Sequence, residues 1–335
     1  MEAGGSFARA PRLERGPAGT LLCMQRSAAP SSTRAEPNDG RWRRQDSRFR
    51  EHVTADGSSG LRAEPGRYHL YLSRACPWCH RTLIVRELKG LQDVVEVSYA
   101  HPYRDERGWA FSGDGFVDEV HGWDFLSEAY TATEPGYDGR VTAPVLWDRE
   151  TGRIVNNESA DVVRMLNSAF DEWGDASVDL YPAPLRAEID ALNEWIYRDV
   201  NNGVYSAGFA RCQEDYDEAF DAVFAALTRL EGILGERRYL TGDTLTEADW
   251  RLWVTLVRFD PIYHTHFRLN GRRVSDHPNL WGYTRELYQL PGIAATTSLD
   301  EAREHYYTTH PKLNPKRQIP RGPLDWDLDA PHGRG

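Results

Sequence analysis

Cysteine, methionine and long apolar runs are all scarce in this chain of 335 residues. Only 4 cysteines and 3 methionines occur. So few and such scattered thiols argue against the disulfide framework of a small secreted protein. The longest apolar runs fall well short of the roughly 18 residues that a membrane-spanning helix needs. We therefore expect a cytoplasmic protein with no membrane association, folded around an ordinary hydrophobic core.

Basic residues are also in the minority, with 40 Lys and Arg against 51 Asp and Glu, and the formal net charge is −11. General nucleic-acid binding requires clustered Lys and Arg, so it is not expected here. The first 50 residues are the exception, because they hold ten Arg against five acidic residues. We expect residues 1–40 to form a disordered basic extension, with a targeting peptide or a misplaced start codon as the alternatives.

Aromatic residues, in contrast, are plentiful, with 11 Trp and 16 Tyr. Charged residues make up 27% of the chain and hydrophobic residues 40%, which is typical of a globular protein. The length is enough for two modest domains. The aromatic rings must therefore fill a core or line a pocket.

The segment after Pro65 predicts a small α/β domain. Strands are expected at 68–72, 94–97, 141–147 and 154–155, and helices from Pro77 to about Lys89 and over 158–170. A long insertion separates the second strand from the last two. This order of elements favours a mixed sheet covered by helices.

Residues 171–184 are acidic and contain two prolines, which indicates a linker, and the chain beyond them is nearly all helical in pattern. Helices are predicted over 187–200 and 215–234. Thr246 and Asp249 form a capping box that opens a further apolar helix. The tail from Pro311 has no periodicity and is expected to lie over a surface.

The most informative motif surrounds Cys76, which precedes Pro77 between the first strand and the first helix. A cysteine at the start of a helix faces unpaired backbone amides and the positive end of the helix dipole, so its pKa should fall. Arg74, His80 and Arg81 are expected to add positive charge. No second pair of ligands accompanies Cys76 and Cys79, so we predict no metal site.

Two further segments suit a thiol site. Pro144 begins a predicted strand. In thioredoxin-like folds a proline at this place is cis, and the residue before it pairs with a bound peptide backbone. An edge-strand proline without function is the alternative. Glu158 and Ser159 open a predicted helix and could bind an α-ammonium and a carboxylate, or serve as ordinary cap residues. Together these segments would hold γ-Glu-Cys-Gly with its sulfur at Cys76.

Several blocks then carry a specific resemblance to the Xi-class glutathione transferases, also called glutathionyl-hydroquinone reductases. It spans about residues 40–323. The blocks are Arg67-Tyr68-His69-Leu70-Tyr71, Ala75-Cys76-Pro77-Trp78, Gly108-Trp109-Ala110-Phe111, Arg140-Val141-Thr142-Ala143-Pro144, Asn156-Asn157-Glu158-Ser159, Val200-Asn201-Asn202-Gly203-Val204-Tyr205, Arg258-Phe259-Asp260-Pro261-Ile262-Tyr263 and His305-Tyr306-Tyr307.

The resemblance implies an α/β plus all-α fold. Residues 41–172 would form a thioredoxin-like glutathione-binding domain, 185–310 a helical glutathione-transferase C-terminal domain, and 311–335 an extended tail. It also implies a homodimer.

The resemblance further assigns roles to individual residues. Cys76 would be the catalytic nucleophile, Tyr205 the proton donor or acceptor, and Tyr263 and Tyr306 would lower the pKa of the sulfur, with the adjacent Tyr307 as the alternative to Tyr306. The residues implied to bind glutathione, the co-substrate, are Trp109, Arg140, Val141, Thr142, Ala143, Glu158 and Ser159.

The implied activity is removal of glutathione from S-glutathionyl-hydroquinones through a Cys76–glutathione mixed disulfide. Two other functions stay open. Many relatives lack a cysteine at position 79, so Cys76 and Cys79 could instead form a dithiol that reduces protein disulfides. A glutathione-binding module without catalytic activity is the third possibility.

Overall fold

A four-stranded mixed sheet organises the N-terminal half of the computed structural model, which describes residues 42, 44–113 and 115–334. The strand order is β2-β1-β3-β4, with β1 parallel to β2 and antiparallel to β3. The strands are β1 (Tyr68–Leu72), β2 (Glu96–Tyr99), β3 (Val145–Asp148) and β4 (Arg153–Asn156). All five residues of β1 are buried, because β1 is a central strand with helices on both faces of the sheet.

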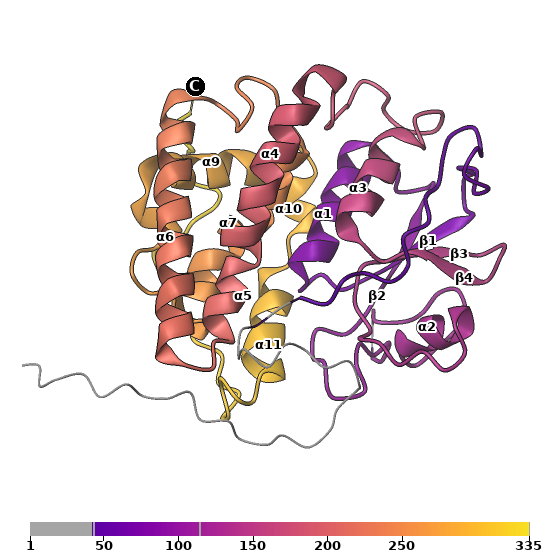
Figure 1. Cartoon of the computed structure of the whole chain (residues 1–335), viewed down its shortest axis with the longest axis horizontal. Helices are drawn as coiled ribbons and strands as arrows, with labels where there is room; N and C mark the ends of the chain where they lie inside the picture. Colours follow the sequence, from indigo (N-terminus) through magenta and orange to yellow (C-terminus); the bar gives the residue numbers. More distant parts are fainter. Residues whose placement is uncertain (1–41, 43, 114, 335) are drawn as a thin grey trace, which may run out of the picture. The chain divides into compact units, whose positions relative to one another are not determined.

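Helices α1 (Pro77–Leu88) and α3 (Ser159–Ser168) pack together on one face of the sheet, and α2 (Ser127–Thr133) lies on the other (Figure 1). The sequence pattern missed α2, which lies in the predicted insertion. This helix is short and buries only Ala129 and Tyr130, so it has little apolar periodicity.

The second strand begins two residues later than predicted. Arg86 causes this shift, because its guanidinium donates hydrogen bonds to the carbonyl oxygens of Gln92 (2.8 Å) and Val95 (2.5 Å). These carbonyl groups therefore stay in a turn, and the ladder with β1 starts where Glu96 pairs with His69.

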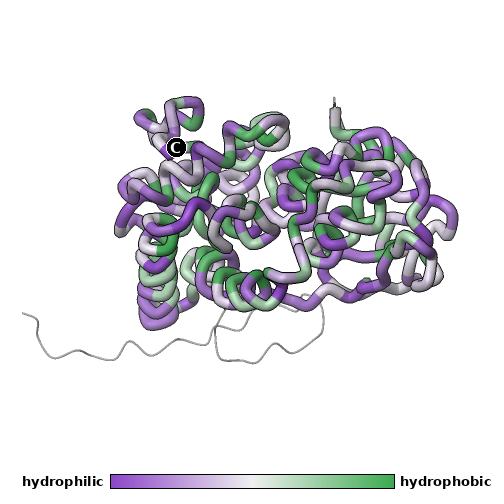
Figure 2. The backbone as a smooth tube through the Cα atoms, turned by 90° about the horizontal axis from the view of Figure 1, so that it is seen from above, coloured by the Kyte–Doolittle hydropathy of each residue, from purple (hydrophilic) through white to green (hydrophobic). Residues whose placement is uncertain are grey.

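The C-terminal half is helical, and apolar and polar stretches alternate along its helices (Figure 2). Its α-helices are α4 (Arg186–Ile196), α5 (Gly203–Gly208), α6 (Gln213–Glu236), α7 (Glu247–Arg258), α8 (His264–His266), α9 (Pro278–Tyr288), α10 (Ile293–Thr296) and α11 (Leu299–Thr309). Short 3-10 turns lie at Ala183–Leu185 and Val274–Asp276, and π-helical turns at Tyr197–Asn201 and Phe259–Tyr263. The predicted fold class is confirmed.

Helix α7 of the C-terminal half packs against α1 of the N-terminal half. Asp249 caps its first turn by accepting hydrogen bonds from the Thr246 amide and, at 2.9 Å, from the Leu240 amide. At its other end the fully buried Arg258 donates to the carbonyl oxygen of Arg74 (3.1 Å) and to Nδ1 of His80 (2.9 Å). The helical half therefore holds the turn that carries Cys76 in place.

Residues 310–334 contain no helix or strand and contact α9. The Gln289 side chain donates to the carbonyl oxygens of Leu328 and Ala330, and Arg334 pairs with Glu286 at 2.7 Å. No helix among the described residues is long and apolar enough to cross a bilayer. The predicted basic extension over 1–40 lies outside the described residues.

Candidate active site

Cys76 is the N-cap residue of α1, with extended backbone angles, and Pro77 occupies the first position of the helix. The Cys76 amide donates to the carbonyl oxygen of Ser73 at 3.0 Å, which closes the turn after β1. Its side chain is nearly buried, with 8% exposed, and its Sγ lies 3.7 Å from the carbonyl oxygen of Ala143. The sulfur is therefore fixed between the helix terminus and the segment before β3.

The Cys76 thiol is poised to ionise. Burial opposes ionisation, but a hydrogen bond from the Cys79 thiol, the backbone amides of Cys79 and Trp78, and the charge of Arg44 outweigh it. Together they lower the pKa of Cys76 to about 6. At neutral pH the reactive thiolate is therefore the dominant form.

Cys79 behaves oppositely. Its side chain has no exposed surface, and its sulfur accepts a long hydrogen bond of 3.5 Å from the Ser73 amide. Burial, together with the neighbouring Cys76 sulfur, raises the pKa of Cys79 well above its ordinary value. Cys79 is thus a protonated donor to the Cys76 thiolate, because the Ser73 amide and the charge of Arg258, which favour its ionisation, are outweighed by burial and the Cys76 sulfur.

The expectation that His80 adds positive charge is wrong. Burial and the charge of Arg258 lower the pKa of His80 well below its ordinary value, so the ring is neutral. Arg74 pairs with Glu301 at 3.1 Å, and Arg81 donates to the Asn201 side chain at 2.7 Å. Neither the sequence pattern nor the motif indicated Arg44, the cation whose charge lowers the pKa of Cys76.

The peptide bond between Ala143 and Pro144 is cis, as the pattern predicted. Tyr130 fixes the residues before it. Its hydroxyl donates to the carbonyl oxygen of Thr142 at 2.7 Å and accepts from the Thr142 amide at 3.1 Å and from the Asn157 side chain at 3.1 Å. This network holds the backbone of 142–143 beside Cys76.

Glu158 and Ser159 start α3, where Glu158 is the N-cap residue. The Glu158 carboxylate accepts hydrogen bonds from the Ala160 amide (3.2 Å) and from Oγ of Ser47 (2.9 Å), and Ser159 is buried. The pair therefore caps α3, which is the structural alternative, and binding of an α-ammonium by Glu158 stays a prediction.

Three tyrosine hydroxyls form a chain in the helical half. The hydroxyl of Tyr306, from α11, hydrogen-bonds to that of Tyr205 and, at 3.1 Å, to that of Tyr263. Burial raises the pKa of all three, so they are neutral and can donate protons. Tyr307 points away, because its hydroxyl donates to the carbonyl oxygens of Pro261 and Ile262.

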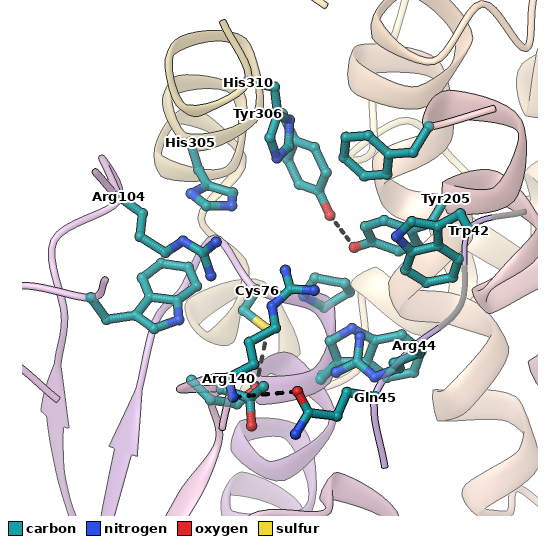
Figure 3. Close-up of a pocket in the computed structure, with 16 residues that line it drawn as sticks. Trp42, Arg44, Gln45, Cys76, Arg104, Arg140, Tyr205, His305, Tyr306 and His310 are labelled. Atoms are coloured by element: carbon teal, nitrogen blue, oxygen red, sulfur yellow. Dashed lines mark hydrogen bonds between the residues drawn. The ribbon is translucent and has the colours of Figure 1, made fainter. Parts of the chain in front are cut away.

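A pocket joins these features, with Cys76 at its base and the Tyr205–Tyr306 pair on one wall (Figure 3). Seven predicted site residues line it: Cys76, Trp109, Arg140, Thr142, Ala143, Tyr205 and Tyr306. Val141, Glu158, Ser159 and Tyr263 are not among the lining residues.

Sequence reasoning missed much of the lining, including Trp42, Arg44, Gln45, Arg104, Phe209, His305 and His310. Trp42 stacks on Tyr205 with ring centroids 5.6 Å apart, and the Arg44 guanidinium lies 4.2 Å from the Trp78 ring centroid. The only available signal was the position of His305 beside Tyr306.

Comparisons with known proteins place this site in a family. The family model for the glutathione S-transferase N-terminal domain matches residues 75–169, and that for the C-terminal domain matches residues 213–286. Glutathionyl-hydroquinone reductase YqjG of Escherichia coli is 52% identical over 305 residues, which cover 88% of this chain and 92% of YqjG. The chain belongs to the Xi-class glutathione transferases.

A second curated relative and two solved structures show the same similarity. Glutathionyl-hydroquinone reductase PcpF of Sphingobium chlorophenolicum is 50% identical, with 85% of this chain and 90% of PcpF covered. The glutathione-bound structure of YqjG has a TM-score of 0.84 and covers 86% of this chain and 96% of its own. A Xi-class transferase from Natrialba magadii has a TM-score of 0.83 at 50% identity, covering 85% and 88%. The resemblance predicted from the motifs is confirmed.

Proposed function

We propose that this protein is a glutathionyl-hydroquinone reductase, which uses glutathione as co-substrate to remove the glutathionyl group from S-glutathionyl-hydroquinones. The observation that carries this proposal is the pairing of an acidic Cys76 thiol with the hydrogen-bonded Tyr205–Tyr306 pair across one pocket. Such a site supplies a nucleophile for sulfur and a proton for the departing carbon.

Glutathione would bind with its sulfur at Cys76 and its backbone along residues 140–143. The Ala143 carbonyl group, which lies beside the Cys76 sulfur, suits the peptide N–H of the cysteinyl unit. Trp109 would pack against the tripeptide. Glu158 would bind the α-ammonium, and the first amides of α3, at Ser159, the α-carboxylate.

In the first step the Cys76 thiolate attacks the sulfur of the bound conjugate. A sulfur–sulfur bond forms, the sulfur–carbon bond breaks, and the ring carbon takes up a proton from Tyr205. Tyr263 and Tyr306 support Tyr205 through the chain of hydroxyls. The ring is thereby reduced to the free hydroquinone, while the two sulfur atoms are oxidised to a mixed disulfide.

In the second step a glutathione thiolate attacks the mixed disulfide at its glutathionyl sulfur. This releases oxidised glutathione and restores the Cys76 thiolate for the next cycle. The low pKa of Cys76 assists this step as well, because a stable thiolate is a good leaving group.

Turnover of glutathionyl-menadiol by the wild type and by Cys76→Ala tests the proposal. We expect the wild type to release menadiol and oxidised glutathione in equal amounts and the variant to release neither. Full turnover by Cys76→Ala would remove Cys76 from the mechanism. Binding of the conjugate by the wild type without any turnover would favour the non-enzymatic module.

We also propose that the protein works as a homodimer in the cytoplasm. The resemblance to the Xi class supports the dimer, and the scarcity of cysteine supports a reducing compartment. Sedimentation equilibrium at micromolar concentration would show twice the chain mass, whereas a single monomeric species would contradict the dimer.

A further inference from the structure

Arg104 is an unusual residue in the pocket, because it is a cation without a polar partner for its side chain. Its guanidinium lies 5.6 Å from the ring centroid of Trp109 and makes no hydrogen bond or ion pair with any residue that the structure describes. Burial lowers the pKa of Arg104 to about 10, and the charge of Arg140 adds to this effect, while the Cys76 thiolate opposes it. The guanidinium is therefore partly desolvated, and no described residue pairs with it.

Two other arginines of the chain have the polar partners that Arg104 lacks. The partly exposed Arg164 pairs with Glu247 at 2.9 Å, and the fully buried Arg258 donates to backbone carbonyl groups and to His80. Buried charges are costly unless they are paired and hydrogen-bonded. The five N–H donors of Arg104 thus lack partners of this kind, in a pocket that opens to ligand.

The loop that carries Arg104 is anchored to α11. The Arg104 amide donates to Oγ1 of Thr309 at 3.2 Å, and Nδ1 of His305 donates to the carbonyl oxygen of Pro102 at 2.7 Å. The His305 ring also stacks on Trp109, with centroids 5.0 Å apart. Figure 3 shows Arg104 in the pocket beside His305, which precedes Tyr306 on α11.

We propose that Arg104 binds a hydroxyl oxygen of the hydroquinone ring in the glutathionyl conjugate and stabilises it as it becomes a phenolate. The inference rests on the proposed function and adds a binding residue to it. The conjugate offers two kinds of acceptor oxygen, the ring hydroxyl and the glycyl carboxylate. Because the loop of Arg104 is held by His305 and Thr309 of α11, the helix that also carries Tyr306, we assign Arg104 to the ring.

The chemistry of the ring explains why a cation is useful there. When the ring carbon that bears sulfur takes a proton from Tyr205, the neighbouring ring hydroxyl passes its own proton back to the Tyr205 phenolate and becomes a carbonyl. As Cys76 forms the sulfur–sulfur bond and the carbon–sulfur bond breaks, that electron pair passes to this oxygen. The oxygen becomes a phenolate, which then takes a proton from water. Arg104 would stabilise this negative charge as it develops.

Titration calorimetry tests the proposal in protein that carries Cys76→Ser, which binds the conjugate without turning it over. The two ligands are the glutathione conjugate of hydroquinone and S-phenylglutathione, which lacks ring oxygens. Hydrogen bonds to charged groups predict that Arg104→Met weakens binding of the hydroquinone conjugate about tenfold or more and leaves S-phenylglutathione within about twofold. Arg104→Lys should recover part of the loss. Arg107→Met is the matched control, since Arg107 is exposed on the same loop and pairs with Asp105.

The conjugate of γ-glutamylcysteine, which lacks glycine, separates the two kinds of acceptor oxygen. Arg104→Met could weaken binding of the hydroquinone conjugate and of S-phenylglutathione equally and leave binding of the shorter conjugate unchanged. That result would assign Arg104 to the glycyl carboxylate and overturn the ring assignment. Unchanged binding of every conjugate by Arg104→Met, with an unchanged melting temperature, would overturn the proposal altogether. Failure of the proposed function would appear separately, as absent turnover by the enzyme that retains Cys76.

Discussion

Cys79 is predicted to stabilise the Cys76 thiolate by donating a hydrogen bond to it. The structure makes Cys79 a buried thiol that donates a hydrogen bond to the Cys76 thiolate, whereas a dithiol mechanism would need Cys79 to attack as a thiolate itself. Replacing Cys79 by Ala removes that donor and leaves the backbone amides of α1 in place. Replacing it by Ser keeps a donor of similar size and is the matched control.

The size of the effect follows from the hydrogen bond. Hydrogen bonds to charged groups contribute roughly 1.5–3 kcal/mol, and a thiol is a weak donor, so we take the lower end. One pKa unit corresponds to about 1.4 kcal/mol. Cys79→Ala should therefore raise the pKa of Cys76 from about 6 by roughly one unit, while Cys79→Ser should change it by less than about half a unit.

The pH dependence of Cys76 alkylation by iodoacetamide measures this pKa. A lowered thiol pKa makes alkylation rise through that pKa and level off above it, so the midpoint should move upward in Cys79→Ala. Mass spectrometry of the labelled peptide separates Cys76 from Cys212, which is partly exposed. An identical midpoint in wild type and Cys79→Ala would refute the donor role, and a trapped Cys76–glutathione adduct found only in Cys79→Ala would favour the dithiol mechanism.

Two further predictions concern the tyrosine chain and the cap of α7. Tyr306→Phe breaks the hydroxyl chain and should lower kcat/KM by roughly ten- to a hundredfold. Tyr307→Phe loses only hydrogen bonds to backbone carbonyl groups, so its kcat/KM should stay within about twofold of the wild type. Equal losses of kcat/KM in the two variants would contradict the assigned geometry. Asp249→Ala leaves the Leu240 amide and the Tyr283 hydroxyl unpaired in the core, so it should lower the free energy of unfolding in urea by about 3 kcal/mol or more. Asp249→Asn should lower this free energy by less. An unchanged urea midpoint in Asp249→Ala would show that the cap contributes little.

Local sequence signals predicted the elements that carry the nucleophile. The strand Tyr68–Leu72 is a short apolar run, and Pro77 suits the first position of a helix, so both bounds were correct without tertiary information. The cis bond before Pro144 was expected because thioredoxin-like folds have a cis-proline at the head of the corresponding strand. These features depend on neighbouring residues in the chain, which a sequence displays directly.

The pocket walls depend on contacts between distant segments, and there the sequence was less informative. Arg104 meets Thr309 and His305 meets Pro102 only after the two halves pack, about 200 residues apart in the chain. The error at His80 has the same origin, because neither its burial nor its contact with Arg258 is visible in the motif. A residue type predicts chemistry, whereas its protonation state depends on the fold.

In the mechanism that we propose, the glutathionyl group passes to Cys76 as the hydroquinone leaves. A single-turnover reaction of the reduced protein with glutathionyl-menadiol, without free glutathione, tests it by intact-protein mass spectrometry and peptide mapping. We predict that each menadiol released leaves one glutathionyl group on Cys76 and none on the other cysteines. Release of menadiol with Cys76 unmodified and glutathione free in solution would contradict it.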